Sequence, residues 1–128
     1  MARDEAGISL AGLSVLVVED EYFIADDICR ALRSLRAEVV GPFASAPEAL
    51  RLLIEKEVIP DLAVLDINLQ GESVYPIADE LARRGVGFVF TTGYDPGGMP
   101  DHYRDMPRWQ KPFDPEALAE SLRTISNR

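Results

Sequence analysis

The sequence lacks the features that mark disulfide-bonded, membrane-spanning or nucleic-acid-binding proteins. Its single cysteine, Cys29, has no partner for an intramolecular disulfide. No apolar run approaches the ~18 residues of a membrane span, and no apolar stretch follows residues 1–5. The 22 Asp and Glu residues outnumber the 13 Lys and Arg residues, and a net charge of −9 does not suit nucleic-acid phosphates. We therefore expect a soluble cytoplasmic protein that binds neither nucleic acid nor membrane, and whose ligand is a cation or a basic protein surface.

Short apolar segments alternate along the chain with segments of helical periodicity. Apolar runs too short for helices predict strands at residues 13–18, 38–41, 62–66, 86–92 and 108–110. Apolar residues at helical spacing predict helices over residues 24–35, 45–57, 74–85 and 114–125. Three prolines between residues 94 and 107 exclude a long helix there and leave a loop with at most a short helix near residues 101–106.

Two of the predicted helices begin with recognisable capping signals. Ser45 followed by Glu48 is a capping-box pattern, with Pro47 inside the first turn. Asp114 directly precedes Pro115, which suits an N-cap followed by the first helical residue. These signals predict where the second and the last helix start.

Five strands that alternate with helices predict an α/β fold, a parallel sheet with helices on both faces. The number and shortness of the strands favour the flavodoxin-like strand order 2-1-3-4-5. The length of 128 residues suits one domain. We expect a loosely held leader over residues 1–12, a single domain over residues 13–128, and no effector domain.

The predicted strands end in polar residues that this fold would bring together. The first ends in Glu19 and Asp20, the third in Asp66 and the fourth in Thr92, and Lys111 follows the fifth. The carboxyl ends of parallel strands share the edge where ligands bind. Three crowded carboxylates repel one another unless a cation neutralises them, and Mg²⁺ is a hard divalent ion that suits oxygen ligands. The hydroxyl and the ammonium complete a cradle for a phosphoryl group.

Each of these motifs alone has an ordinary explanation. The acidic run Glu19-Asp20-Glu21 suits the start of any helix, and Asp66 could serve a turn. Their joint occurrence at successive strand ends favours function. One alternative is a Mg²⁺-dependent phosphohydrolase with Asp66 as nucleophile. Another is a flavin or nucleotide carrier, which would need a phosphate-binding loop where the chain has carboxylates.

Four segments together resemble the signature segments of response-regulator receiver domains. They are Val17-Val18-Glu19-Asp20-Glu21, Leu65-Asp66-Ile67-Asn68, Thr92-Gly93 and Lys111-Pro112-Phe113. Phe90-Thr91-Thr92-Gly93-Tyr94 also resembles the motif of the stand-alone receivers called FATGUY regulators, with Thr91 where that motif has alanine. The resemblance covers residues 13–125. It implies bacterial two-component signalling, in which the chain accepts a phosphoryl group from a histidine kinase or histidine phosphotransfer protein.

The resemblance also implies a role for each residue at the acidic edge. Asp66 matches the phosphorylated aspartate, Asp20 the direct ligand of Mg²⁺, and Glu19 the acidic neighbour that holds the metal through water. The backbone carbonyl of Asn68 would be a further ligand. Receivers catalyse only their own phosphorylation and dephosphorylation, so we do not expect an enzyme that acts on other substrates.

The residues that would contact or report the phosphoryl group follow from the same resemblance. Thr92 matches the hydroxyl that engages the phosphoryl group, Lys111 the ammonium that pairs with it, and Pro112 is the candidate for a cis peptide bond. The family usually has Tyr or Phe three residues before the lysine, where this chain has Arg108. We hypothesise that Tyr94 and the loop after it move on activation instead. We expect a monomer or weak dimer that signals to a downstream protein or passes the phosphoryl group onward.

Overall fold

Five parallel strands form the centre of the protein. The computed structural model describes residues 8–93 and 99–126. The strands are β1 (Ser14–Val18), β2 (Glu38–Phe43), β3 (Leu62–Asp66), β4 (Gly87–Thr92) and β5 (Arg108–Gln110). Their order in the sheet is β2-β1-β3-β4-β5, and each neighbouring pair is parallel. The predicted flavodoxin-like arrangement is confirmed.

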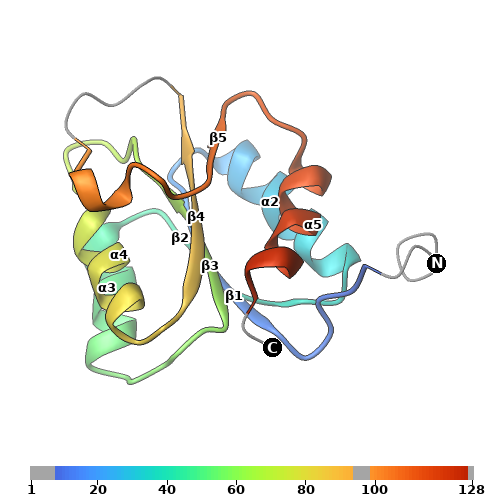
Figure 1. Ribbon diagram of the computed structural model, residues 1–128, viewed down its shortest axis with the longest axis horizontal. Helices are drawn as coiled ribbons and strands as arrows, with labels where there is room; N and C mark the ends of the chain where they lie inside the picture. Colours follow the sequence, from blue (N-terminus) through green and yellow to red (C-terminus); the bar gives the residue numbers. More distant parts are fainter. Residues whose placement is uncertain (1–7, 94–98, 127–128) are drawn as a thin grey trace.

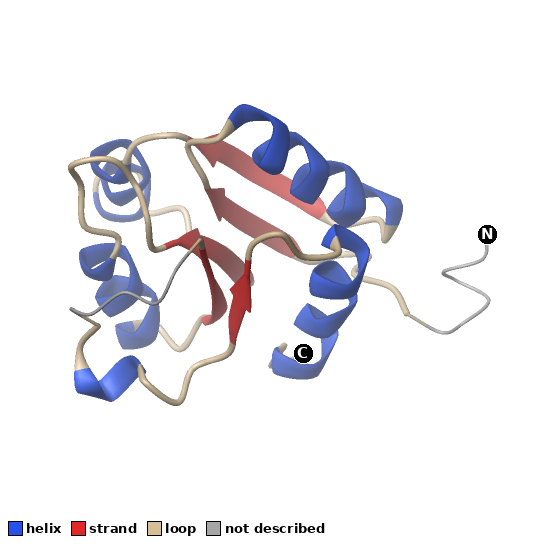
Figure 2. Ribbon diagram, turned by 90° about the horizontal axis from the view of Figure 1, so that it is seen from above, coloured by secondary structure: helices blue, strands red, loops and turns tan. Residues whose placement is uncertain are grey.

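Helices cover both faces of this sheet (Figure 1). They are α2 (Tyr22–Ser34), α3 (Ala46–Ile54), α4 (Tyr75–Arg83), α5 (Pro115–Ile125) and the short 3-10 helix η1 (Asp101–Tyr103). Helices α2 and α5 contact each other on one face, and α3 and α4 do so on the other, as the view from above in Figure 2 also shows. Within the described residues, no helix is long and apolar enough to cross a membrane.

The central strands are apolar along their length because both of their faces are covered. Successive side chains of a strand point to opposite faces. On β1, Leu16 and Val18 join the core under α3 and α4, whereas Val15 and Val17 join the core under α2 and α5. Strand β3 is buried throughout, including its terminal Asp66. A charged side chain is thereby held at the edge of the sheet and shielded from water.

Strand β2 continues beyond its predicted end at residue 41. It runs through Pro42 to Phe43, and its register against β1 shifts along the way. A proline is tolerated because β2 lies at the edge of the sheet. No strand in the described part of the chain pairs with its outer side, so the missing N–H costs no hydrogen bond between strands there. Gly41 has a φ of 113°, and a Cβ there would lie 2.8 Å from the carbonyl oxygen of Val17. Only glycine fits this close approach of the two strands.

The second helix begins where it was predicted, directly after Ser45, but it lacks the predicted side-chain cap and ends earlier. The side chain of Ser45 makes no capping hydrogen bond, so the predicted capping box is wrong. The backbone N–H of Ala46 instead donates to Oε1 of Glu72, at 2.9 Å, from the loop after β3. Helix α3 ends at Ile54 rather than at residue 57, and Glu57 has a φ of 52°, outside the helical region.

The cap predicted at Asp114 is present, and the N-terminal segment is more closely packed than expected. Asp114 accepts a hydrogen bond from the backbone N–H of Glu116, at 3.0 Å, at the start of α5. Leu10, within the segment expected to be a loose leader, is fully buried and donates its N–H to the carbonyl oxygen of Leu35. The packed part of the chain therefore begins before residue 13.

Candidate functional site

Three carboxylates meet where β1 and β3 end. These strands run side by side with Val18 opposite Leu65, so the residues that follow emerge at the same edge. Glu19 and Asp66 are buried, and Asp20 is half-buried. One carboxylate oxygen from each of the three lies within 4.8 Å of the other two. The structure thus brings together the acidic residues that the sequence placed in one site.

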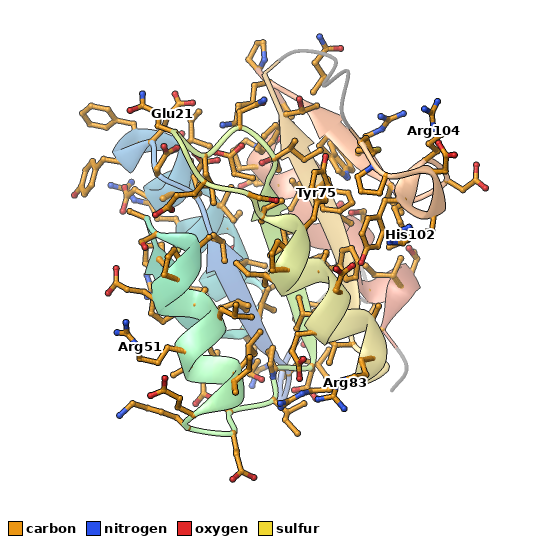
Figure 3. The ribbon with its side chains drawn as sticks, turned by 90° about the vertical axis from the view of Figure 1, so that its left-hand side faces the viewer. Glu21, Arg51, Tyr75, Arg83, His102 and Arg104 are labelled. Carbon is orange, nitrogen blue, oxygen red and sulfur yellow. The ribbon has the colours of Figure 1, made fainter. Side chains whose placement is uncertain are left out.

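Lys111 reaches this acidic cluster from the turn after β5. Its Nζ lies 3.1 Å from Oε1 of Glu19 and 3.4 Å from Oδ2 of Asp66. It also lies 3.1 Å from Oε1 of Glu21, whose exposed side chain is labelled at this edge in Figure 3. The sequence analysis missed this contact, because no local signal separates Glu21 from other acids at a helix start. One ammonium is therefore shared by three carboxylates.

Burial makes the charges of this cluster costly. Desolvation raises the pKa of Glu19 to about 7, against a hydrogen bond from the backbone N–H of Glu21 that lowers it. Desolvation also raises the pKa of Asp66. For Lys111, desolvation opposes the charge, but the nearby carboxylates of Asp66 and Glu19 outweigh it and raise the pKa. The site carries more negative charge than one ammonium can balance.

The buried carboxylate oxygens suit a hard cation. Oε1 of Glu19 and Oδ2 of Asp66 have no hydrogen-bond partner among the described residues. Lys111 is close enough to both for an ion pair, but not in the geometry of a hydrogen bond to these atoms. A buried acceptor without a donor is costly. A divalent ion would satisfy the oxygen of Asp66 directly and that of Glu19 through a bound water, so the donor set fits Mg²⁺.

Asn68 links the ends of β3 and β4. Its backbone N–H donates to Oδ1 of Asp66, at 2.9 Å. Its side-chain Oδ1 accepts from the hydroxyl of Thr92, at 3.1 Å, and from the backbone N–H of Gly93, at 2.6 Å. The sequence analysis gave Asn68 only a backbone role and missed these side-chain contacts. They depend on the path of the loop after β3, which no periodic pattern encodes.

Two further positions that the sequence singled out, Pro112 and Arg108, lie at the fifth strand. The Lys111–Pro112 peptide bond is cis. Arg108 is exposed, and its guanidinium donates to Sδ of Met99, at 3.5 Å. Tyr94 lies outside the described residues, so the movement proposed for it stays a prediction.

Aromatic rings fill the interior beside β4 on the side of α4. Tyr75 stacks on Tyr103 with ring centroids 6.0 Å apart and an angle of 14° between the rings. Both rings contact the edge or face of the buried Phe90. The hydroxyl of Tyr75 is buried and, among the described residues, has no hydrogen-bond partner. Tyr75 is half-buried, and Figure 3 shows it apart from Glu21.

Solved structures share both this fold and part of the sequence. SdrG from Sphingomonas melonis Fr1 is 35% identical with a TM-score of 0.75, over 88% of this chain and 95% of that chain. A BeF₃-activated conformation of SdrG is 34% identical with a TM-score of 0.71, over 91% and 98% of the two chains. The response regulator PhyR from Brucella abortus is 29% identical with a TM-score of 0.74, over 98% of this chain and 51% of that chain.

Comparison of the sequence with those of curated proteins also finds relatives. The sensory transduction protein LytT of Bacillus subtilis (strain 168) is 29% identical over 115 residues, which are 87% of this chain and 47% of LytT. The chain spans about half the length of the curated relatives it matches. No family model matches the chain.

Proposed function

The chain belongs to the receiver domains of response regulators, and from this premise we propose that Asp66 accepts a phosphoryl group from a histidine kinase or a histidine phosphotransfer protein. The observation that carries the proposal is the environment of Asp66. Its buried carboxylate lies at the end of β3 between two further carboxylates and the ammonium of Lys111. An ionised oxygen held beside a cation is suited to attack a phosphoryl group that carries negative charge.

The positions of these groups support the following reaction. A carboxylate oxygen of Asp66 attacks phosphorus in line with the bond to the donor histidine. The new P–O bond forms as the P–N bond breaks, and the electron pair of that bond returns to the imidazole, which takes a proton from solvent. Lys111 compensates charge on the phosphoryl oxygens, and the Thr92 hydroxyl donates to one of them. Attack of water on the acyl phosphate later restores Asp66 and releases inorganic phosphate.

Mg²⁺ is the cofactor that this site would hold. Asp20 and Asp66 would bind it directly, the backbone carbonyl of Asn68 would complete the protein ligands, and Glu19 would hold it through water. When bound, the ion offsets the repulsion between these carboxylates and the incoming phosphoryl oxygens. The unsatisfied oxygens of Glu19 and Asp66 support this assignment.

A surface beside the site suits the phosphoryl donor. Tyr22 and Phe23, at the start of α2, are 74% and 79% exposed, and their rings contact each other. A groove of about 380 Å³ opens next to Lys111, and its lining includes the apolar Ile24 and Phe113. Exposed aromatic residues beside acidic ones favour a partner surface with apolar and basic residues. The phosphorylated protein would then act on a downstream protein or pass the phosphoryl group onward.

Labelling with acetyl phosphate tests this function. The wild-type protein with Mg²⁺ should form an acyl phosphate that is labile to hydroxylamine and that mass spectrometry locates on Asp66. Asp66→Asn should take up none, because the amide is not a nucleophile, whereas Asp79→Asn, on the exposed face of α4, should label like the wild type. Undiminished labelling of Asp66→Asn would contradict the proposal. Release of phosphate from external monoesters with many turnovers would instead indicate a phosphohydrolase.

A further inference from the structure

Two hydrogen-bond donors at the end of β4 converge on one oxygen. The hydroxyl of Thr92 and the backbone N–H of Gly93 both donate to Oδ1 of Asn68, at 3.1 and 2.6 Å. Thr92 is buried at this edge of the sheet. A single carbonyl oxygen that receives a hydroxyl and a backbone N–H is bound much as an anionic oxygen is bound in an oxyanion hole.

These donors lie beside the acceptor carboxylate. Asp66 is paired in register with Thr91, the residue before Thr92. The Asn68 backbone N–H donates to Oδ1 of Asp66, at 2.9 Å, so the same residue contacts both the carboxylate and the two donors. A phosphoryl group on Asp66 would place oxygens within this small region. Its oxygens carry more negative charge than an amide oxygen and are the stronger acceptors.

We propose that the side chain of Asn68 is a placeholder for a phosphoryl oxygen. In the unphosphorylated protein, Oδ1 of Asn68 keeps the Thr92 hydroxyl and the Gly93 N–H aligned and satisfied. When Asp66 carries a phosphoryl group, Asn68 releases both donors to it. Asn68 is thus a positioning residue whose side chain competes with the phosphoryl group. This inference rests on the proposed function, because it assumes that Asp66 is the acceptor.

Truncation of Asn68 should change the affinity for a phosphoryl mimic in opposite directions, depending on whether its side chain competes with the mimic or supports the site. If Asn68 only supported the site, its truncation would weaken binding of any phosphoryl mimic. If Asn68 is a placeholder, truncation removes a competitor and strengthens binding. The loss of one ordinary hydrogen bond corresponds to roughly a fivefold change in an equilibrium constant. The increase in affinity should be smaller in a variant that already lacks the Thr92 hydroxyl.

Titration with beryllofluoride, a phosphoryl mimic, in the presence of Mg²⁺ tests the inference through Trp109 fluorescence. Asn68→Ala and Asn68→Ser should each bind the mimic about fivefold more tightly than the wild type, because neither side chain can offer the carbonyl oxygen. In the Thr92→Val background, Asn68→Ala should give a smaller gain. Gln110→Ala, which truncates an exposed amide at the end of β5, is the matched control and should leave affinity unchanged.

The amide proton of Gly93 gives a second readout that needs no mimic. In the unphosphorylated protein its chemical shift and exchange rate should change in Asn68→Ala and not in Gln110→Ala. Equal or weaker binding of beryllofluoride by both Asn68 variants, while the wild type binds it, would overturn the placeholder and leave the proposed function intact. A wild-type protein that binds no beryllofluoride and forms no acyl phosphate would overturn both.

Discussion

Glu19 is an acid whose burial opposes the charged form. Its ordinary pKa of 4.5 rises to about 7 in the folded protein, chiefly through desolvation. Between these two values the unfolded chain has lost the proton while the folded protein still holds it. The free energy of unfolding of the metal-free protein should therefore fall as the pH rises from about 4.5 to about 7.

Glu19→Gln tests this pH dependence. Glutamine mimics the protonated acid at every pH, so the variant should be more stable than the wild type above pH 7. Its stability should decline less steeply between the two pKa values, and the remaining decline comes from Asp66, whose pKa is also raised. Urea unfolding in the presence of EDTA at a series of pH values measures it. Glu48→Gln, at an exposed position of α3, is the control and should keep the wild-type slope. An unchanged slope in Glu19→Gln would contradict the raised pKa.

Asp20 and Glu19 should differ in their effect on Mg²⁺ binding. Glu19→Gln should weaken Mg²⁺ by about tenfold, as expected for a group that acts through water, and Asp20→Asn should weaken it more, because it removes a direct ligand. Trp109 reports binding, since it pairs with Thr91, which in turn pairs with Asp66. Equal Mg²⁺ affinities of the wild type and Asp20→Asn in a fluorescence titration would exclude this arrangement.

At the scale of elements, η1 is held to α4 by polar contacts to Asp79 and by the stacking of Tyr103 on Tyr75. The hydroxyl of Tyr103 donates to Oδ1 of Asp79, at 2.5 Å, and His102 lies 3.6 Å from the same atom. Figure 3 shows His102 on the flank of the molecule, away from the acidic edge. Because η1 is only three residues long, its position depends on these contacts more than on its own helical hydrogen bonds.

Two tyrosine variants should differ in stability, because one hydroxyl makes a hydrogen bond and the other makes none to the residues that the structure describes. Tyr103→Phe removes the hydrogen bond to Asp79 and should lower the free energy of unfolding by about 1 kcal/mol. Tyr75→Phe removes a buried hydroxyl that has no partner within the described residues, so it should be neutral or stabilising. Urea unfolding of both variants measures the difference. A larger loss in Tyr75→Phe than in Tyr103→Phe would contradict this assignment.

At the scale of the whole molecule, the negative charge favours a basic partner over nucleic acid. The net charge of −9 should speed association with a basic surface and make the rate fall with added salt. Acidic residues also surround Asp66, the proposed acceptor of the phosphoryl group. Recognition of the phosphoryl donor would therefore combine long-range attraction with contact to the exposed aromatic pair on α2.

Replacing Tyr22 and Phe23 with alanine should weaken binding of the phosphoryl donor protein without changing the reactivity of Asp66. Both side chains are exposed, so the double variant should fold normally and form the acyl phosphate from acetyl phosphate at the wild-type rate. Its phosphorylation by the cognate histidine kinase should slow by about tenfold or more, as expected for aromatic contacts at an interface. A phosphotransfer profile against purified kinases and phosphotransfer proteins identifies the donor. An equal rate from that donor would exclude this surface.

Much of the fold could be predicted because its pattern is local. Both faces of the central strands are covered, so strands read as short apolar runs and helices as amphipathic segments. The limits of β5 agree with the prediction, and the prolines before it account for the short η1. The errors lie at element ends. Strand β2 extends past Pro42, and α3 is capped by Glu72 of a distant loop rather than by its own Ser45.

The sequence by itself determined which residues reach the acidic edge, because parallel strands place whatever follows each apolar run on one side of the sheet. Only the tertiary structure decided how those residues are paired. Thr92 and Gly93 meet Asn68 across 24 and 25 residues, Ala46 meets Glu72 across 26, and each contact depends on the path of an irregular loop. Local periodicity specifies elements but not loop paths, because the contacts that fix a loop come from elements distant in sequence.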